Sequence, residues 1–227
     1  MEDTYPLIVP AIMADEWESL VTQVELITPV ATRVQIDVMD GHLVPSFSFP
    51  YNKTMLSSQR FPHTDSIHYD VHLMVQHPQE VGERFIAAGA DTIIAQIEGF
   101  RESEAEKVFM EWKEKEVETG VSLLLDTPLE VVDSLIQSGS VSMVQIMSIA
   151  RIGYQGEQFD ERTYERISIL RERYPDITIA VDGGVKIDTV PQLIERGAEL
   201  LGVGSAIMKS ENPVAALVSF NESVKRS

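Results

Sequence analysis

Two aspartates stand out as side chains that could move protons to and from a substrate. Asp37 lies in the apolar run 33–40, where alternation places Gln35 and Met39 on the same face, and Asp182 lies near the end of a later run. Two carboxylates on opposite sides of a substrate can remove a proton from one face of a carbon and return a proton to the other face. The pair therefore predicts epimerisation of a carbon next to a carbonyl group. The alternative is that each aspartate only forms a turn before a glycine.

A histidine could join the first of these aspartates. His72 lies in the apolar run that follows the run of Asp37, so the two side chains are expected on neighbouring strands. A lone histidine in such a run is often a structural residue of the core. Beside Asp37, the alternative that His72 is a ligand in the site has equal weight. The next run adds Gln96 and Glu98, whereas Asp40 is expected to form a turn.

Glycines gather after the last three apolar runs. In a barrel of alternating strands and helices, loops after the last strands present backbone N–H groups to a phosphate. The chain has 36 acidic and 18 basic side chains and a formal net charge of −18, so attraction of an anion must come from local amides, with Arg151 as a candidate contributor. Any one glycine could be an ordinary turn residue, but the series predicts a phosphate cradle. The residues concerned are Gly153, Gly156, Gly183, Gly184, Gly204 and Ser205.

The elements that must position these side chains are short strands that alternate with helices from end to end. This alternation, with a repeat of roughly 25 to 30 residues, is typical of a (β/α)8 barrel. An open doubly wound sheet usually has fewer strands and a glycine-rich turn after the first, where this chain has Ala14 and Asp15. We therefore predict an α/β fold, a single (β/α)8 TIM barrel that spans residues 1–227 as one domain. The predicted strands are 7–13, 33–40, 69–75, 92–98, 120–126, 143–149, 177–183 and 200–205.

Capping signals predict where the helices begin. Asp15 is expected to cap the first helix, and Pro78 and Pro128 are expected in the first turns of two others. The predicted helices are 15–26, 78–89, 102–118, 128–139, 189–196 and one that begins near Pro213.

Composition excludes several classes of protein. With 44% hydrophobic and 24% charged residues the chain is globular, and the absence of cysteine removes disulfides, thiolate metal sites and a cysteine nucleophile. The negative charge repels nucleic-acid phosphates and anionic lipids, so neither partner is expected. Residues 1–10 lack the features of a secretory signal, and no apolar run approaches the length of a membrane span, so we expect a cytoplasmic protein.

Several longer motifs connect these residues, and in them the chain resembles the ribulose-phosphate 3-epimerase family over nearly its whole length. The motifs are Asp37–His42 with Val44 and Pro45, Asp70–Val75 with Pro78, Ala88–Asp91, Met147–Ser148, Val181–Gly184 and Gly204–Ile207.

The resemblance implies a barrel of the ribulose-phosphate-binding type and an isomerase of the pentose phosphate pathway. Its reaction would be epimerisation of carbon 3 of a ketose phosphate, D-ribulose 5-phosphate to D-xylulose 5-phosphate. Asp37 and Asp182 would be the acid and base residues, and an enediolate would be the intermediate. The resemblance also implies a homo-oligomer.

The resemblance further implies a divalent metal, held by the residues at positions 35, 37, 72 and 182, which polarises the substrate oxygens. Three methionines fall where the family lines its pocket with thioethers; flexible core filling is the alternative for each. The substrate-binding residues implied, besides the glycines and Ser205, are His72, Met39, Met74 and Met147, with Met13 less firmly placed.

Departures from the family are concentrated at the site. Glutamine stands where the family has histidine at Gln35 and Gln96, Ala11 stands where it has serine, and the loop 150–156 is one residue longer. The amide oxygen of Gln35 suits magnesium or manganese better than zinc.

Two hypotheses follow for the cofactor. The first is a weak divalent-metal site (magnesium, manganese, iron or zinc) formed by Asp37, His72 and Asp182, with Gln35 as a fourth ligand. The second is a metal-independent site in which Gln35 donates a hydrogen bond to the enediolate oxygen.

The substrate stays open among phosphorylated ketoses. One alternative to the pentose phosphate is a hexulose phosphate such as allulose 6-phosphate, which the altered loop 150–156 could accommodate. The other is a barrel that binds a sugar phosphate without turnover, since several residues expected to contact the substrate have changed. Retention of both Asp37 and Asp182 favours an enzyme.

Overall fold

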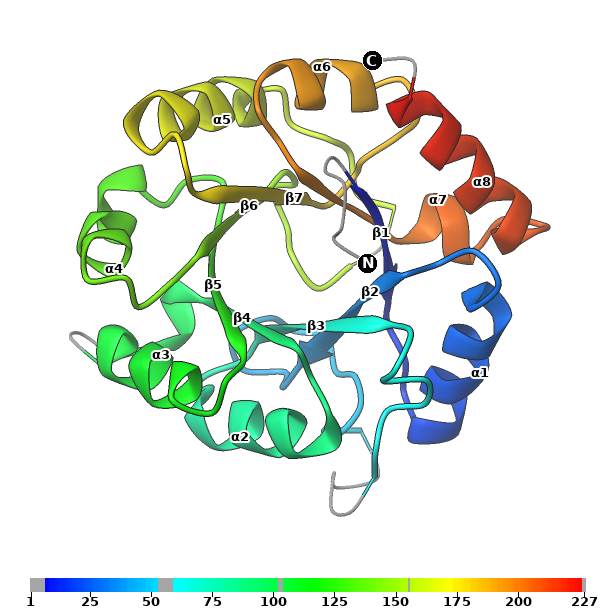
Figure 1. The fold of residues 1–227 in the computed structure, drawn as a ribbon, viewed down its shortest axis with the longest axis horizontal. Helices are drawn as coiled ribbons and strands as arrows, with labels where there is room; N and C mark the ends of the chain where they lie inside the picture. Colours follow the sequence, from blue (N-terminus) through cyan, green and yellow to red (C-terminus); the bar gives the residue numbers. More distant parts are fainter. Residues whose placement is uncertain (1–6, 53–58, 102–103, 155, 226–227) are drawn as a thin grey trace.

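The computed structural model describes residues 7–52, 59–101, 104–154 and 156–225. Within them eight parallel strands close into a barrel in chain order, and helices surround it (Figure 1). The predicted (β/α)8 barrel is thus confirmed. The strands are β1 (Leu7–Ile12), β2 (Arg33–Met39), β3 (His68–Met74), β4 (Thr92–Gln96), β5 (Glu118–Leu123), β6 (Met143–Met147), β7 (Thr178–Asp182) and β8 (Leu200–Val203).

The helices lie on the outside of the barrel. They are α1 (Trp17–Ile27), α2 (Gln79–Ala88), α3 (Ala105–Lys113), α4 (Asp133–Gln137), α5 (Arg162–Arg173), α6 (Val190–Glu195), α7 (Ser205–Met208) and α8 (Pro213–Val224), with 3₁₀ turns η1 (Ile97–Gly99) and η2 (Leu129–Val132). No helix in these described segments has the length and apolar character that crossing a membrane requires.

Alternation along the strands divides the side chains between two environments. On β2, Val34, Ile36 and Val38 belong to the large core between the barrel and the helices. The residues between them, Gln35 among them, point into the barrel, where Gln35 reaches Asp182 of β7. Because β2 is buried along its whole length, both faces of this strand are enclosed.

The interior of the barrel is filled in layers. An apolar layer fills the barrel toward the N-terminal ends of its strands, so the barrel is a packed core rather than a channel. Its members are Val9, Ile94, Met143, Ala180 and Leu200. A second apolar cluster lies at the C-terminal mouth, formed by Met39, Val44, Met74, Met147, Ile149 and Ile152. Polar residues of β2, β3 and β7 therefore occupy a site between apolar layers.

The helices were predicted less accurately than the strands: α5 and α7 correspond to no predicted helix, and several helix ends differ. Asp15 does not cap α1: Glu16 is the N-cap residue and makes no side-chain cap bond, while Asp15 Oδ1 accepts a hydrogen bond from Asn52 at 2.9 Å. The residues after Pro128 begin as a 3₁₀ turn before α4 forms. The predicted helix 102–118 is shorter, as α3, and Glu118 already begins β5; residues 102 and 103 lie outside the described residues.

Candidate functional site

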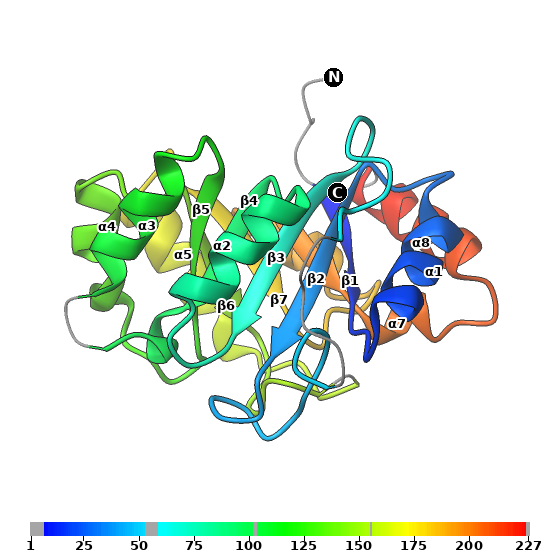
Figure 2. The same ribbon diagram turned by 90° about the horizontal axis from the view of Figure 1, so that it is seen from below.

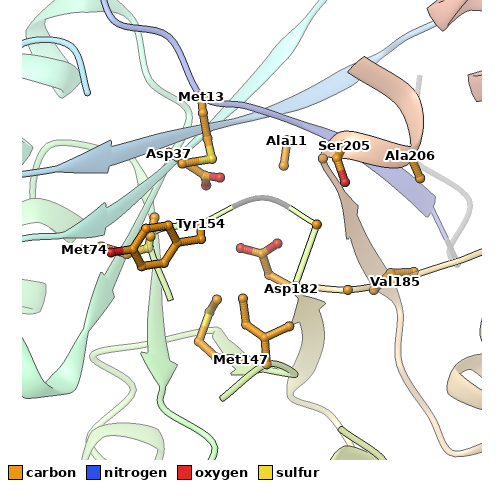
Figure 3. Close-up of a pocket in the computed structure, with 16 residues that line it drawn as sticks. Ala11, Met13, Asp37, Met74, Met147, Tyr154, Asp182, Val185, Ser205 and Ala206 are labelled. Atoms are coloured by element: carbon orange, nitrogen blue, oxygen red, sulfur yellow. The ribbon is translucent and has the colours of Figure 1, made fainter. Parts of the chain in front are cut away.

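The two aspartates lie at the C-terminal mouth of the barrel. Asp37 is near the end of β2 and Asp182 is the last residue of β7. Both line one pocket, which contains about 510 Å³ of free space that includes its open entrance. Figure 3 shows both carboxylates pointing into this pocket from different strands. The aspartates are 7% and 6% exposed, so they are shielded from bulk water yet accessible from the pocket.

Two buried serines hold the backbone behind these carboxylates. Ser48 donates from Oγ to the carbonyl of Asp37 at 2.8 Å and accepts from the backbone N–H of Met39 at 3.0 Å. Ser148 donates from Oγ to the carbonyl of Asp182 at 3.0 Å, and its own N–H donates to the same oxygen at 2.8 Å. Each aspartate is therefore fixed by hydrogen bonds at its main chain, independently of what its carboxylate contacts.

Gln35 joins the two carboxylates. Its amide nitrogen donates to Asp37 Oδ1 at 2.8 Å and to Asp182 Oδ2 at 3.0 Å, which uses both amide hydrogens. In this orientation Gln35 presents a donor to the centre of the site rather than a ligand oxygen. Its predicted role as a metal ligand stays a prediction and would need the amide to rotate.

His72, on the neighbouring strand β3, faces the same two carboxylates and is completely buried. Its Nδ1 is 3.5 Å from Asp37 Oδ1 and 3.4 Å from Asp182 Oδ2, which are ion-pair distances. Burial favours the neutral ring, but the two carboxylates outweigh it and raise the pKa of His72 to about 9. Nδ1 has no hydrogen-bond partner among the described residues.

The carboxylates also act on each other. Burial and then the charge of Asp182 raise the pKa of Asp37, while His72 and Gln35 oppose that rise. Two carboxylates in one site favour a state in which the pair holds one proton. One member can then act as an acid while the other acts as a base.

Asp37, His72 and Asp182 could hold a metal ion. One ligand atom from each lies within 4.8 Å of the others, and all three residues are buried. The unpartnered Nδ1 of His72 is a further sign of fit, because a buried nitrogen without a hydrogen bond is rare unless another group binds it. Two carboxylate oxygens and one imidazole nitrogen are a suitable donor set for a divalent cation.

The structure brings most of the predicted substrate-binding residues to this pocket. Two of them are not part of the lining: Met39 lies in the apolar cluster at the mouth, and His72 is completely buried behind the carboxylates. The predicted residues that line the pocket are Asp37, Asp182, Met74, Met147, Gly153, Gly156, Gly183, Gly184, Gly204 and Ser205, with Met13; Ala11, which stands where the family has serine, also lines it.

The glycine-containing loops approach one another closely at the mouth. Gly184 has φ +65°, and a Cβ there would lie 2.7 Å from the backbone nitrogen of Phe159, so the loop after β7 can take no larger residue at this point. A Cβ on Gly153 would lie 2.9 Å from Val44, so the loops after β6 and β2 are in contact, as the lower edge of Figure 2 shows. Gln155 of the same loop lies outside the described residues.

Arg151 is committed elsewhere in this structure. Its guanidinium donates to Glu157 at 2.7 Å and lies 5.6 Å from the centre of the Tyr154 ring. It is not part of the pocket lining, so the expectation that it helps attract a phosphate has no geometric support.

Sequence reasoning missed several residues of the site. Tyr154 lines the pocket together with Met74 (Figure 3), and Ser48 anchors Asp37 although eleven residues separate them. Neither lies at a strand end, so the rule that found the aspartates could not find them. The other unpredicted lining residues are Ile149, Val185 and Ala206.

Comparisons with known proteins identify the family of this chain. A sequence model described as the ribulose-phosphate 3 epimerase family matches residues 7–208. The cytoplasmic isoform of ribulose-phosphate 3-epimerase from Oryza sativa is 30% identical over 222 residues, covering 97% of this chain and 95% of its own. The ribulose-phosphate 3-epimerase of Treponema pallidum is 33% identical over 179 residues, covering 76% of this chain and 77% of its own.

Solved structures support the fold. A 3-hexulose-6-phosphate synthase superposes with a TM-score of 0.71 at 15% identity, covering 96% of this chain and 99% of its own. At that identity the similarity extends to the barrel alone. The family match over most of the chain, together with relatives at 30% identity or more, shows that this chain belongs to the ribulose-phosphate 3-epimerase family, a family of epimerase enzymes.

Proposed function

We propose that the protein epimerises carbon 3 of a ketose phosphate, converting D-ribulose 5-phosphate to D-xylulose 5-phosphate, with Asp37 and Asp182 as the two proton-transfer residues. The observation that supports this most directly is the meeting of both carboxylates in one pocket, where Gln35 contacts both of them. The names of the relatives supply the substrate class.

The proton movements follow from the pair. One carboxylate takes the proton from carbon 3, and the electron pair of the broken C–H bond forms an enediolate over carbons 2 and 3. The protonated carboxyl of the other aspartate then gives its proton to the opposite face of carbon 3, which inverts that centre. The raised pKa of Asp37 supports this assignment, since one member of the pair must be protonated at the start.

The developing charge on the enediolate oxygens needs a positive partner. His72 faces the same point from below and, with its raised pKa, carries a positive charge when no metal is bound. Asp37, His72 and Asp182 would hold a divalent ion, for which the oxygen-rich donor set favours magnesium or manganese. When bound, such an ion polarises the carbonyl and hydroxyl oxygens of the substrate.

Gln35 has a different role from the one expected for a metal-free site. Both of its amide hydrogens are engaged by Asp37 and Asp182, so neither is directed at a substrate oxygen. We propose that Gln35 holds the carboxylates at their mutual distance against charge repulsion.

The phosphate of the substrate would bind at the opposite side of the pocket from Met74. Gly183 and Gly184 after β7, and Gly204 and Ser205 after β8, line the pocket and would supply backbone N–H donors; Figure 3 shows Ser205 and Val185 on the side away from Met74. Because the chain as a whole is strongly acidic, these local dipoles are the source of attraction for the dianion.

Solvent-exchange measurement tests the proposal. Ribulose 5-phosphate incubated with the protein in deuterated water should acquire deuterium at carbon 3 as xylulose 5-phosphate forms. Label with a hexulose phosphate but not with ribulose 5-phosphate would redirect the substrate assignment. Binding of ketose phosphates without any label would support the non-catalytic alternative and end the epimerase proposal.

The cofactor is tested separately. Metal analysis of the purified protein, with activity before and after chelation, should show loss of activity on chelation and recovery with manganese or magnesium. Tightly held stoichiometric zinc would contradict the preference for a hard cation, and full activity after complete chelation would contradict the metal altogether.

A further inference from the structure

Gln96 is a buried amide that connects three strands below the site. It ends β4, is fully buried, and its amide group lies 3.1 Å from His72 Nε2 of β3 and 3.1 Å from Ser122 Oγ of β5. The other end of the amide lies 2.8 Å from Glu98 Oε2. Gln96 contacts neither carboxylate of the pocket, so the proton-transfer scheme leaves it without a role.

The partners of Gln96 decide which end of its amide is the nitrogen. A carboxylate has only acceptors, so the end that faces Glu98 must be the NH₂ group. With that assignment the amide nitrogen donates to Glu98 Oε2 at 2.8 Å and to the carbonyl of Ser122 at 3.3 Å. The opposite orientation would place two acceptor oxygens 2.8 Å apart, a repulsion that the assigned orientation replaces with a hydrogen bond.

The assignment determines the proton on His72. The amide oxygen of Gln96 now faces His72 Nε2 at 3.1 Å and also accepts from Ser122 Oγ. A carbonyl oxygen accepts only, so Nε2 must carry a hydrogen. When the ring is neutral, its lone pair is therefore on Nδ1, the nitrogen that faces Asp37 and Asp182.

Glu98 is itself held by the end of β5. Its second carboxylate oxygen, Oε1, accepts from the backbone N–H of Leu124 at 3.0 Å and from the hydroxyl of Thr127. Both oxygens of Glu98 are thus used, one on the loop after β5 and one on Gln96. The direction of every bond from this loop to His72 is fixed.

We infer that Glu98 and Gln96 are positioning residues, which hold His72 with its Nε2–H donated to Gln96 and its Nδ1 directed at the two catalytic carboxylates. The inference rests on the proposed function only for its consequence, namely that Nδ1 is the nitrogen offered to a metal ion or to the carboxylates. Hydrogen-bonded partners of this kind orient metal-binding histidines and are typically worth 10- to 100-fold in affinity or activity.

Two variants test the inference together. Gln96→Leu removes the acceptor and keeps a side chain of similar size. The double variant Gln96→Glu with Glu98→Gln exchanges the amide and the carboxylate. In the exchange, the amide now at position 98 can still accept from Leu124 and Thr127 through its oxygen. Its nitrogen can donate to the carboxylate now at position 96, which still accepts from His72. Ser122→Ala is the matched control, because it removes a neighbour of Gln96 but leaves the chain from Glu98 to His72 intact.

The main measurement is nuclear magnetic resonance of protein labelled with ¹⁵N in its histidines, without metal. The signal of His72 is identified by its absence in a His72→Gln variant. We expect an Nε2–H that exchanges slowly with water in the wild type, the exchanged pair and Ser122→Ala, and that exchanges rapidly in Gln96→Leu. This readout does not depend on turnover, so it separates a failure of the inference from a failure of the epimerase proposal.

Two further readouts distinguish positioning from general structure. Manganese affinity should fall by about 10- to 100-fold in Gln96→Leu and recover in the exchanged pair. The kcat for ribulose 5-phosphate should fall in Gln96→Leu with little change in KM, since Gln96 does not contact the pocket. An Nε2 without a hydrogen in the wild type would overturn the inference, as would wild-type exchange in Gln96→Leu or an exchanged pair that behaves like Gln96→Leu.

Discussion

Strands β2 and β3 carry charged side chains at both ends of the barrel, and these charges are hydrogen-bonded to each other at one end but not at the other. At the N-terminal end, Arg33 of β2 donates to both oxygens of Asp70 of β3 at 2.8 Å, and both side chains are 2% exposed. At the C-terminal end of the same strands, His72 Nδ1 lies 3.5 Å from Asp37 and 3.4 Å from Asp182 but makes no hydrogen bond to either of them. One end is a compensated ion pair, and the other leaves donors and acceptors partly unsatisfied.

The difference separates stability from chemistry. Two forked hydrogen bonds fix Asp70 and Arg33 in one arrangement and leave nothing to react. Asp37 and Asp182, by contrast, repel each other, and Nδ1 of His72 has no hydrogen-bond partner among the described residues. Both features cost stability, but they leave groups that can exchange protons or bind a cation. The difference predicts opposite outcomes when a single charge is removed at each end.

The largest effect is expected from removing a charge at the mouth. Asp182→Asn and Asp37→Asn should each lower kcat by about 10²- to 10⁴-fold or more, the range for loss of a positioned acid or base. Because each substitution also removes like-charge repulsion, the free energy of unfolding should stay the same or rise. Turnover and deuterium uptake at carbon 3, beside thermal unfolding, check both parts. Full activity in either variant would remove that aspartate from its role.

The next effect is expected at the opposite end. Asp70→Asn should lower the free energy of unfolding by up to about 3–5 kcal/mol, because it removes the carboxylate that accepts two hydrogen bonds from the buried guanidinium of Arg33, whose ion pair with Glu118 at 3.7 Å remains. The kcat of the folded protein should change little, since neither residue lines the pocket. Denaturant unfolding measures the first quantity and initial rates measure the second.

A double variant controls for the loss of charge itself. Replacing the pair by apolar residues of similar size, Arg33→Met with Asp70→Leu, should recover much of the stability lost in Asp70→Asn. If the double variant were less stable than Asp70→Asn, the pair would be a net source of stability. The contrast between the two ends would then be one of degree.

The sequence predicted the charged residues at the C-terminal mouth of the barrel but not the ion pair at its N-terminal end, for a physical reason. A carboxylate at the end of an apolar strand conflicts with its surroundings, so Asp37 and Asp182 were visible as exceptions. Arg33 and Asp70 are far apart in the chain and only the register of β2 with β3 brings them together. The orientation of Gln35 toward both carboxylates likewise depends on strands β2 and β7 at once.

The fold was predictable because its signal is repeated. Eight apolar runs each gave the same indication, and the strands lie within a few residues of the predicted ranges. Helix ends were less predictable, since the competing partner of Asp15 is Asn52, which the sequence places 37 residues away. The single-domain and homo-oligomer expectations stay predictions.

A smaller effect on kcat is expected at Gly202, whose lack of a side chain leaves space for the carboxylate of Asp182. A Cβ on Gly202 of β8 would lie 2.9 Å from Asp182 Oδ1, so Gly202→Ala must displace that carboxylate. Displacement of a reacting group by about 1 Å can cost 10²-fold, and we expect kcat to fall by up to that factor with the fold retained.

The matched control is another glycine of the barrel interior. A Cβ on Gly120 of β5 would meet Ile94 at 3.2 Å and Met143 at 3.3 Å, which are apolar side chains of the lower layer. Gly120→Ala should therefore change stability slightly and kcat hardly at all. Equal losses of kcat in the two variants would show that crowding of the barrel, rather than the position of Asp182, limits turnover.

The smallest effect is expected on the free energy of unfolding when the pH is lowered, and the change has opposite signs for Asp70 and Asp37. Burial alone would raise the pKa of Asp70, but the charge of Arg33 and the bond from His68 hold it below its usual value. A carboxyl whose pKa is lower in the folded than in the unfolded state, where it is about 3.9, stabilises the fold above that unfolded value. This contribution is lost as the pH falls through the folded pKa.

The difference in unfolding free energy between wild type and Asp70→Asn should therefore be constant at neutral pH and shrink below about pH 4. For Asp37 the sign is reversed: its raised pKa means that ionisation opposes folding, so Asp37→Asn should gain stability relative to wild type as the pH rises through that pKa. Denaturant unfolding of the three proteins over a pH series compares the two slopes. Slopes of the same sign would show that the two ends of the barrel are electrostatically alike.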